Sequence, residues 1–231
     1  LYWLDRLSAE ERDSPRWHYW RGRTLEALSR MDEAKPIYQG IANRRDYYGF
    51  LATDRLSTPY AISSTPLVIP ASDLDALLTG SPGLRRAREL YTLGRESEAD
   101  AEWQQATQGF NRQALQQAAV LAHRWDWHPQ AIATISRAEH WDNLELRFPL
   151  AYRDVVINNA RADMVDPPWV YAVIRQESSF RPAARSPVGA LGLMQIMPAT
   201  GHQIAQELRD ASADHPALLK PDINLRYGIH Y

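Results

Sequence analysis

Residues 166–200 read DPPWVYAVIRQESSFRPAARSPVGALGLMQIMPAT, and this stretch decides how the rest of the chain is interpreted. Its first residues are typical of a helix start, because Asp166 can accept bonds from free amides and Pro167 suits the first helical position. Three aliphatic residues follow at helical spacing: Val170, Val173 and Ile174. Glu177 lies seven, four and three residues beyond them, which predicts that its carboxylate shares their stripe and faces the interior.

A glutamate on such a stripe suits acid catalysis. Burial disfavours the charged form and raises the pKa of a carboxylic acid, and an acid still protonated near neutral pH can give its proton to a substrate. Periodicity alone leaves another interpretation open. Arg175 and Arg181 are close in sequence, and a glutamate near a helix end is often paired with such residues or solvated.

The second half of the stretch, residues 186–198, combines glycines, methionines and one amide in an apolar run. Gly189 and Gly192 permit unusual dihedral angles or close backbone approach. Met194 and Met197 offer an adaptable apolar surface, and Gln195 offers both a donor and an acceptor. An isolated run of this kind favours a plain core helix that ends before the proline.

Together these segments resemble a known family. RQESSF at 175–180, SPVGALGLMQIMPAT at 186–200, and an asparagine, glycine and tyrosine at 224, 228 and 231 occur in the order seen in the soluble lytic transglycosylases. The catalytic domain of that family has a lysozyme-like fold. The close match covers about residues 169–231, and the helical region before it resembles the family's N-terminal superhelix more loosely.

The resemblance implies a reaction and roles. Glu177 would protonate the glycosidic oxygen between N-acetylmuramic acid and N-acetylglucosamine, then take the proton of the muramyl C6 hydroxyl, leaving 1,6-anhydromuramic acid. Ser186 and Gln195 would bind the sugar's N-acetyl and hydroxyl groups, and Met197 would pack beside the glycan. The residues implied to support the site are Ser178, Gly189, Gly192, Met194, Asn224 and Tyr231. Structural alternatives remain for two residues, Ser178 as a hydrogen bonder at the helix end and Met197 as core.

Only one acid lies within the motif, whereas glycoside cleavage commonly uses two carboxylates. Asp166 is eleven residues before Glu177, or roughly 16 Å along a continuous helix. A missing second carboxylate is consistent with assistance from the substrate's own N-acetyl group. Two other functions stay open, a hydrolase of the goose-lysozyme type and a non-catalytic helical-repeat scaffold of the cell wall, although the intact Glu177 and Gln195 argue against the scaffold.

Composition excludes several classes. The 231 residues are 45% hydrophobic and 23% charged, with a net charge of −2, so no broad attraction to nucleic acid is expected. The absence of cysteine removes disulfides and thiolate chemistry. No apolar run approaches the roughly 18 residues of a membrane span, and the seven histidines lack metal-site spacing. We therefore expect no metal and no cofactor. Peptidoglycan glycan strands in the periplasm are the partner and place that the resemblance implies.

The remaining sequence predicts an all-α protein, a superhelical array of helix hairpins followed by a partial lysozyme-like domain. A helix pair is expected over 15–43, with one face of its first helix formed by Trp17, Trp20, Leu25 and Leu28. The second helix is marked by Ala34, Ile37, Tyr38 and Ile41, with Pro36 in its first turn. Residues 93–99 with Trp103 match residues 28–34 with Tyr38, at an offset of 65 residues. This is close to twice the roughly 34-residue period of stacked helix hairpins.

We divide the chain into a superhelix segment (1–56), an uncharged, proline-containing linker (57–72), a helical linker domain (73–147) and a lysozyme-like domain (148–231). The tryptophans between Trp103 and Trp141 are expected to pack between repeats. The chain starts without methionine or signal peptide and reads as a processed segment. A final helix capped by Asp222 stops at Tyr231, while family domains continue to an Ala-Tyr-Asn motif. We therefore expect a site that is incomplete at the C-terminus and weakly active or inactive alone.

Overall fold

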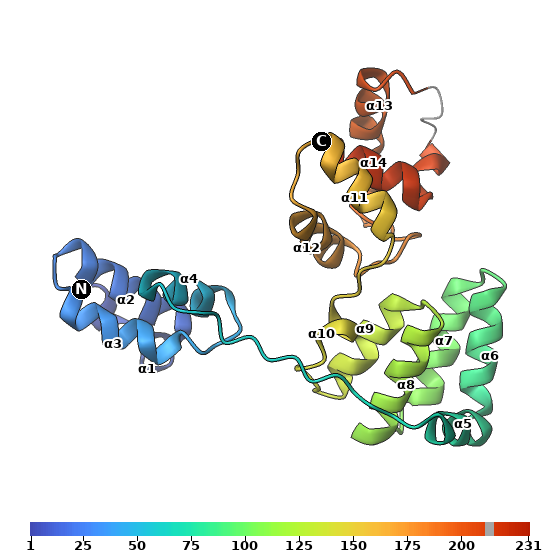
Figure 1. Ribbon diagram of the computed structural model, residues 1–231, viewed down its shortest axis with the longest axis horizontal. Helices are drawn as coiled ribbons and strands as arrows, with labels where there is room; N and C mark the ends of the chain where they lie inside the picture. Colours follow the sequence, from blue (N-terminus) through green and yellow to red (C-terminus); the bar gives the residue numbers. More distant parts are fainter. Residues whose placement is uncertain (211–214) are drawn as a thin grey trace. The chain divides into compact units, whose positions relative to one another are not determined.

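The computed structural model describes residues 1–210 and 215–231, and helices are the regular elements of this described part (Figure 1). Its only β-type pairing consists of two isolated bridges, Arg185 with Leu191 and Leu191 with Ile196. The chain divides into two compact units, Leu1–Ser63 and Ser64–Tyr231. The all-α prediction is therefore confirmed.

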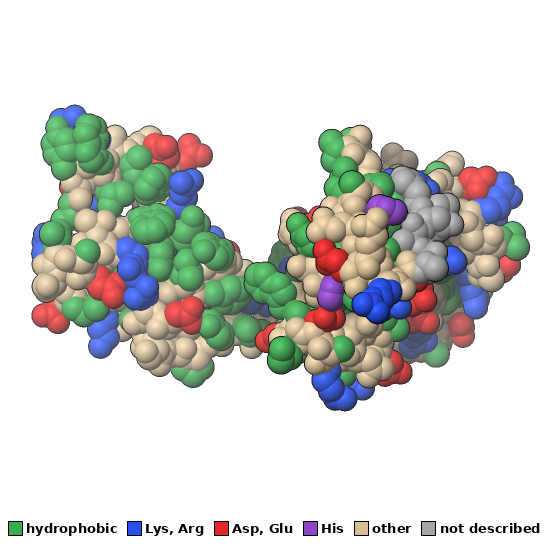
Figure 2. Space-filling model, turned by 90° about the horizontal axis from the view of Figure 1, so that it is seen from above, with side chains coloured by type: hydrophobic (Ala, Val, Ile, Leu, Met, Phe, Trp, Pro, Cys, Tyr) green, Lys and Arg blue, Asp and Glu red, His purple; other side chains and the backbone are tan. Residues whose placement is uncertain are grey.

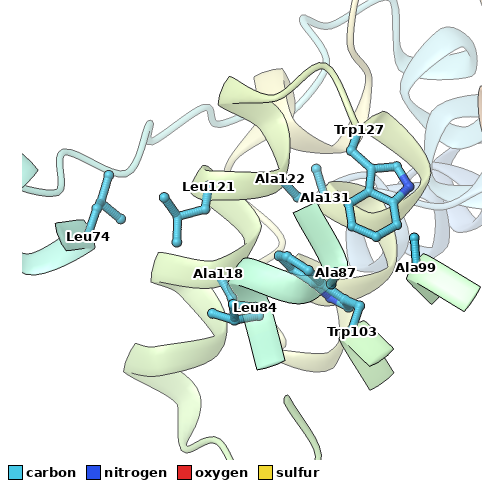
Figure 3. Close-up of a cluster of buried hydrophobic side chains, with 10 residues drawn as sticks. All are labelled: Leu74, Leu84, Ala87, Ala99, Trp103, Ala118, Leu121, Ala122, Trp127 and Ala131. Carbon is cyan, nitrogen blue, oxygen red and sulfur yellow. The ribbon is translucent and has the colours of Figure 1, made fainter. Parts of the chain in front are cut away.

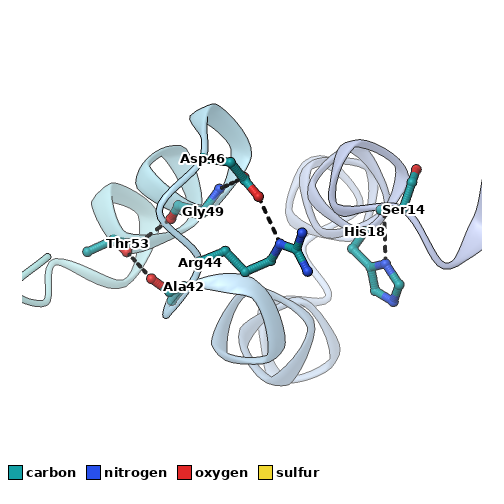
Figure 4. Close-up of polar contacts among 7 residues, drawn as sticks. All are labelled: Ser14, His18, Ala42, Arg44, Asp46, Gly49 and Thr53. Carbon is teal, nitrogen blue, oxygen red and sulfur yellow. Dashed lines mark hydrogen bonds and ion pairs between the residues drawn. The ribbon is translucent and has the colours of Figure 1, made fainter. Parts of the chain in front are cut away.

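The first unit contains five short elements: η1 (Leu4–Arg6), α1 (Ala9–Arg12), α2 (Pro15–Ala27), α3 (Met31–Ile41) and α4 (Tyr47–Leu56). Polar contacts fix the turns between them (Figure 4). Asp46 precedes α4, accepting the Gly49 amide at 2.9 Å and the Arg44 Nε at 2.8 Å. The Thr53 hydroxyl donates to the Ala42 carbonyl at 2.9 Å and so joins α4 to the end of α3. The helix pair expected over residues 15–43 thus forms where the sequence predicted it.

The buried face of α2 differs from the prediction. Tyr19, Gly22 and Leu25 are buried, whereas Trp20 and Leu28 are exposed. The reason is a close approach of α3: a Cβ added to Gly22 would lie 2.5 Å from the ring of Tyr38. Because that ring needs a position without a side chain, the glycine, and not the tryptophans, sets which side of α2 faces the core.

Pro36 was also placed wrongly, because it lies inside α3 and not in its first turn. Proline cannot donate a backbone hydrogen bond, so an interior position normally weakens a helix. Its side chain is exposed, and α3 continues past it to bury Tyr38 and Ile41. Packing of these two residues therefore outweighs the local preference.

An extended stretch, residues 58–70, lies between helices α4 and α5 in sequence, and the second unit begins within it at Ser64. Six helices follow it: α5 (Ala71–Gly80), α6 (Pro82–Thr92), α7 (Glu96–Thr107), α8 (Arg112–Arg124), α9 (His128–Arg137) and α10 (Leu144–Arg147). Neighbours in sequence pack as hairpins, α6 with α7 and α8 with α9. Stacked hairpins are the array that the repeat predicted.

The repeated sequence corresponds to a repeated structure. Ser29 and Gly94 occupy equivalent turns with φ of 60° and 72°. Ala34 and Ala99 are fully buried at the start of the second helix of each hairpin. The turns also carry equivalent ion pairs, Arg30 with Glu33 and Arg95 with Glu98. The sequence match therefore marks the same two-helix unit in both parts of the chain.

The core of the array is built around two tryptophans (Figure 3). Trp103 is 0% exposed, and its indole nitrogen donates to the Thr134 hydroxyl at 3.0 Å. Trp127 packs against it edge to face at 5.3 Å, and Tyr91 stacks on Trp127 at 4.5 Å. Trp141, in contrast, is 46% exposed. The packing interpretation therefore holds for Trp103 and Trp127, and for Trp125, which is partly buried against the same core, but not for Trp141.

The last part contains α11 (Arg153–Ala162), α12 (Pro167–Glu177), α13 (Pro198–Glu207), η2 (His215–Leu219) and α14 (Pro221–His230). A shared core joins α11, α12 and α14: Val156, Ala160, Val170, Ile174, Leu225 and Ile229. Asp222 does not cap α14, because Lys220 holds the cap position and Asp222 lies in the first turn. Asp166 does precede α12, but its side chain makes no capping hydrogen bond.

Charged side chains of both signs are interspersed on the face shown in Figure 2. Apolar side chains gather on the first unit, which exposes aromatic residues such as Tyr2, Trp3 and Tyr47. Among the residues that the structure describes, none of the helices has the length and apolarity needed to cross a bilayer. Within residues 1–210 and 215–231, no group of histidine and acidic side chains is arranged to hold a metal ion.

Lowering the pH should destabilise the second unit through His128. Burial, followed by the neighbouring His123, holds the pKa of His128 below its ordinary value, and its Nδ1 is buried without a partner. The unfolded side chain takes up its proton near pH 6.5, and the folded one only at lower pH. The unfolded state then binds more protons, so the free energy of unfolding falls as the pH drops below about 6.5.

The measurement is the melting temperature across the range from about pH 7.5 to about pH 5, on either side of the ordinary histidine pKa. His128→Gln removes this titration, so the decline at acid pH should be shallower in the variant. The same acid dependence in both proteins would contradict the assignment.

Candidate active site

Helix α12 places Glu177 on a stripe with Trp169 and Val173, since residues four apart lie on the same side of a helix. Val170 and Ile174 on the neighbouring rows are 1% and 0% exposed and pack into the core of α11 and α14. The Glu177 side chain is exposed, so the prediction that it faces the interior was wrong. The physical reason is its position: α12 ends at Glu177, one turn beyond the residues that the core covers.

The chain leaves α12 through a strained turn. Ser178 donates to the Ile174 carbonyl with both its amide, at 3.1 Å, and its hydroxyl, at 3.2 Å. These bonds correspond to the alternative in which Ser178 is a hydrogen bonder at the helix end. Ser179 and Phe180 then have φ of 50° and 67°. The left-handed region costs roughly 1–2 kcal/mol for a residue with a side chain, so two in succession need support from their surroundings.

Part of that support comes from the Phe180 side chain. It is 2% exposed and lies between the rings of His128, at 6.2 Å, and Tyr171, at 6.4 Å. The backbone after Glu177 is therefore fixed by a buried side chain, and this fixes the direction from which the carboxylate is presented.

The glycine-rich block is not a helix, contrary to the simplest expectation for its sequence. It forms turns in which the Ser186 hydroxyl accepts the Ala190 amide at 2.9 Å. Gly189 and Gly192 have φ of 94° and 77°, a region that glycine adopts without penalty. Gln195 has φ of 51°, and its Nε2 donates to the Gly192 carbonyl at 2.9 Å. The two glycines thus permit the turns, and Gln195 closes them.

Asn224 on α14 holds this block in place. Its Oδ1 accepts the Met194 amide at 2.8 Å, and its Nδ2 donates to the carbonyls of Leu191 and Leu218 at 2.9 and 2.8 Å. The residue is fully buried. A Cβ on Gly192 would lie 2.3 Å from this amide, so the glycine makes room for it. Both residues therefore shape the site and do not face it.

Asn224→Ala should lower the free energy of unfolding by about 3 kcal/mol, at roughly 1 kcal/mol for each of the three lost hydrogen bonds. The buried amide and carbonyls that remain cannot reach water. Thermal unfolding measures the effect, and Asn158→Ala, an exposed asparagine on α11, is the matched control. Equal melting temperatures for the two variants would show that the block does not depend on Asn224.

The elements enclose a pocket of about 480 Å³ beside α12. Four of the predicted residues line it: Met194, Gln195, Met197 and Tyr231. Ser178, Ser186, Gly189, Gly192 and Asn224 do not line it, and Glu177 stands one helical turn beyond the lining residue Val173. The structure therefore gathers the amide, both methionines and the tyrosine around one hollow, with the glutamate adjacent to it along α12.

Other residues that line the pocket were not predicted from the sequence, including Trp169, Val165, Thr200 and Ile204. Trp169 could have been found, because it lies four residues before Val173 and eight before Glu177 on one side of the helix. Its side chain is 69% exposed at the pocket. The others come from α13 and from the segment before α12, and no local pattern indicates that these meet.

None of the residues lining this pocket is acidic. Helix α12 runs without interruption from Pro167 to Glu177, which keeps Asp166 roughly 16 Å from Glu177. Asp163 and Glu207 engage His230, at 2.9 and 3.8 Å. Within the part of the chain that the structure describes, Glu177 thus supplies a carboxylate next to the pocket, and the residues that line the pocket supply no carboxylate side chain.

The opposite side of α12 borders a separate, mainly apolar hollow of about 640 Å³ that includes Phe148, Leu150 and Arg175. Burial, followed by the nearby Arg147, lowers the pKa of Arg175, whose Nε donates to the Arg147 carbonyl at 2.9 Å. Burial also raises the pKa of Tyr171 on the same side. None of the predicted site residues lines this hollow.

Comparison with known proteins defines the class of the chain. A family model described as the soluble lytic murein transglycosylase L domain matches residues 78–144, over the helical array. A second, described as the transglycosylase SLT domain, matches residues 154–231, which include α12, the glycine-rich block and α14.

Individual relatives agree with these models. The soluble lytic murein transglycosylases of Salmonella typhimurium and Escherichia coli K12 are each 32% identical over 99% of this chain, which spans 35% of their length. An inactive glutamate-to-glutamine mutant of the lytic transglycosylase Slt from Pseudomonas aeruginosa superposes with a TM-score of 0.87 at 37% identity, over 99% of this chain and 37% of that one. A complex of the 70-kDa soluble lytic transglycosylase with bulgecin A gives 0.90 at 30% identity, over 100% and 37%. The chain therefore belongs to the soluble lytic murein transglycosylase family.

Proposed function

We propose that this chain cleaves peptidoglycan glycan strands as a lytic transglycosylase, breaking the β-1,4 bond from N-acetylmuramic acid to N-acetylglucosamine and forming 1,6-anhydromuramic acid. The observation that carries the proposal is the position of Glu177, at the end of the α12 stripe that lines the pocket with Trp169 and Val173. The family matches over residues 78–144 and 154–231 support it.

The chemistry needs one group that acts first as an acid and then as a base. Protonated Glu177 gives its proton to the glycosidic oxygen as the bond from that oxygen to muramyl C1 breaks. The substrate's N-acetyl oxygen stabilises the positive charge that develops at C1. The Glu177 carboxylate then takes the proton of the C6 hydroxyl while O6 bonds to C1. The acid is regenerated and no water is consumed, so a second carboxylate is not required.

The other residues would bind the glycan. Gln195 uses its Nε2 to close the turn, which leaves its Oε1 to accept a bond from a sugar hydroxyl or amide. The Ser186 hydroxyl accepts the Ala190 amide and can still donate its own proton. Met197, 41% exposed, and Trp169 offer apolar surface for sugar rings. Ser178, Gly189, Gly192, Met194 and Asn224 would support these groups, and Tyr231 lines the pocket.

The relatives supply independent support. One of them is inactive as a glutamate-to-glutamine mutant, and another binds bulgecin A. This chain spans about a third of their length, so activity, the glycan substrate and a periplasmic location are proposals for it.

The test is product analysis. The purified chain and the Glu177→Gln variant are each incubated with murein sacculi under the same conditions. The released muropeptides are separated, and their masses are measured by mass spectrometry. Products lighter by one water than the reducing muropeptides support the proposal. Reducing ends would indicate a hydrolase of the goose-lysozyme type. If no product is released and the chain specifically retains cell-wall proteins in a pull-down, the result would favour a non-catalytic helical-repeat scaffold.

A further inference from the structure

The turn after Glu177 is anchored by helices that belong to a different part of the chain. Arg181, the first residue beyond Phe180, extends its Nη1 to Asp100 Oδ2 on α7 at 2.7 Å. Glu96, one turn earlier on α7, lies 3.9 Å from the same nitrogen. The contact spans 81 residues of sequence and joins the helical array to the segment that presents the glutamate.

Asp100 is itself held in position. Gln130 on α9 donates from Nε2 to the second carboxylate oxygen of Asp100 at 2.5 Å. Gln130 is 5% exposed, and the Asp100 and Arg181 side chains are 22% and 30% exposed. Because α7 and α9 both fix this carboxylate, Arg181 meets a charge whose place is set by the array. Partial shielding from water also strengthens the ion pair relative to a fully exposed one.

The turn needs such an anchor. Ser179 and Phe180 are both left-handed, and strained backbone persists only where the surroundings over-determine it. Phe180 is fixed on one side by His128 and Tyr171, and Arg181 on the other by Asp100. If either anchor is lost, the turn can relax towards ordinary dihedrals, which would change the direction of the last residues of α12.

We propose that Asp100 is a positioning residue for Glu177 that acts through Arg181, an inference that rests on the proposed function of Glu177. The array of residues 78–144 then does more than support the transglycosylase domain, since it supplies the carboxylate that sets the catalytic turn. A displacement of about 1 Å in a reacting group can cost about 10²-fold in rate, so a distant anchor can control turnover.

The test compares the complete chain with Asp100→Ala, Arg181→Ala and the double variant on soluble glycan strands. Asp100→Asn keeps the volume of the side chain and serves if the alanine variant does not fold. Glu102→Ala is the matched control, because it removes another carboxylate of α7, one that pairs with Arg86 and does not touch the turn. We expect kcat to fall about 10- to 100-fold in each Asp100 and Arg181 variant, with KM little changed.

The double variant should be no slower than either single variant, because both residues act through one contact. A purely structural ion pair would lower the melting temperature and leave kcat per folded molecule at the level of Glu102→Ala. That result, or additive losses in the double variant, would overturn the proposal.

An arm independent of activity separates this proposal from the proposed function. The amides of Ser178 and Arg181 donate to the carbonyls of Ile174 and Ser178, so their hydrogen exchange reports on the turn. Exchange at both should be faster by about tenfold in Asp100→Ala, while exchange at Val170 in α12 stays unchanged. Unchanged exchange at the turn refutes the anchor even if the chain is active. Faster exchange in a chain that releases no product upholds the anchor and refutes the function.

Discussion

Glu177→Gln should lower the rate of anhydromuropeptide release by about 10²- to 10⁴-fold, the usual contribution of a general acid or base. Glutamine has nearly the same shape and can still donate a hydrogen bond, but it cannot give up a proton and recover it. Because Glu177 is exposed, the exchange should change the free energy of unfolding by no more than about 0.5 kcal/mol. The loss should therefore be confined to turnover.

The experiment measures release per folded molecule from sacculi, after the unmodified chain has been shown to be active under the same conditions. Asp154→Asn is the control, since it makes the same chemical change at an exposed carboxylate of α11. Glycan binding by the Glu177 variant should persist, because the pocket lining is unaltered. Retention of most of the activity would remove Glu177 from the mechanism.

The position of Glu177 in the structure shows what a local sequence pattern can and cannot predict. The spacing correctly put this residue on a stripe with Val173, because helical geometry is fixed by sequence separation. Burial depends instead on which elements cover the stripe, and the core of α11 and α14 stops short of the last turn of α12. The exposure of the carboxylate was therefore beyond the reach of periodicity.

Helix starts were likewise predictable from local sequence, whereas the buried faces of helices were predictable only in part. Helix α12 begins at Pro167 as predicted, since the preference of proline for the first helical position is a local property of the chain. The buried face of α2 was predicted correctly at Leu25 and wrongly at Trp20 and Leu28, because the position where Tyr38 packs closely is a glycine, which hydrophobic spacing ignores.

Contacts between residues far apart in the sequence are the second feature that local patterns could not predict. Asn224 bonds to residues 30 and 33 positions away, and Arg181 meets Asp100 across 81. The motif resemblance marked Asn224 as a supporting residue without indicating how it acts. Nothing in the local sequence marked Asp100. The all-α class, the repeated hairpin and the family followed from the sequence, whereas the bonds that hold the site together required the structure.

Trp103→Ala should lower the free energy of unfolding of the second unit by roughly 3–5 kcal/mol, the usual cost of removing a large buried aromatic side chain. The indole is 0% exposed, contacts the rings of Trp125 and Trp127, and donates to Thr134. Its loss would leave a cavity between the hairpins and an unpaired hydroxyl. For a unit of this size the melting temperature should fall by roughly 6–20 °C.

Turnover per folded molecule should remain close to that of the unmodified chain, because no acid or base lies in this core. Although Trp103 and Asp100 both lie on α7, their variants should affect different properties. Trp103→Ala should lower stability and leave turnover normal, whereas Asp100→Ala should lower turnover. Trp141→Ala, which removes a tryptophan that is 46% exposed, should cost less than about 1 kcal/mol and is the control. A Trp103→Ala protein that keeps its melting temperature but binds glycan more weakly would show that this indole stacks on sugar and does not hold the hairpins together.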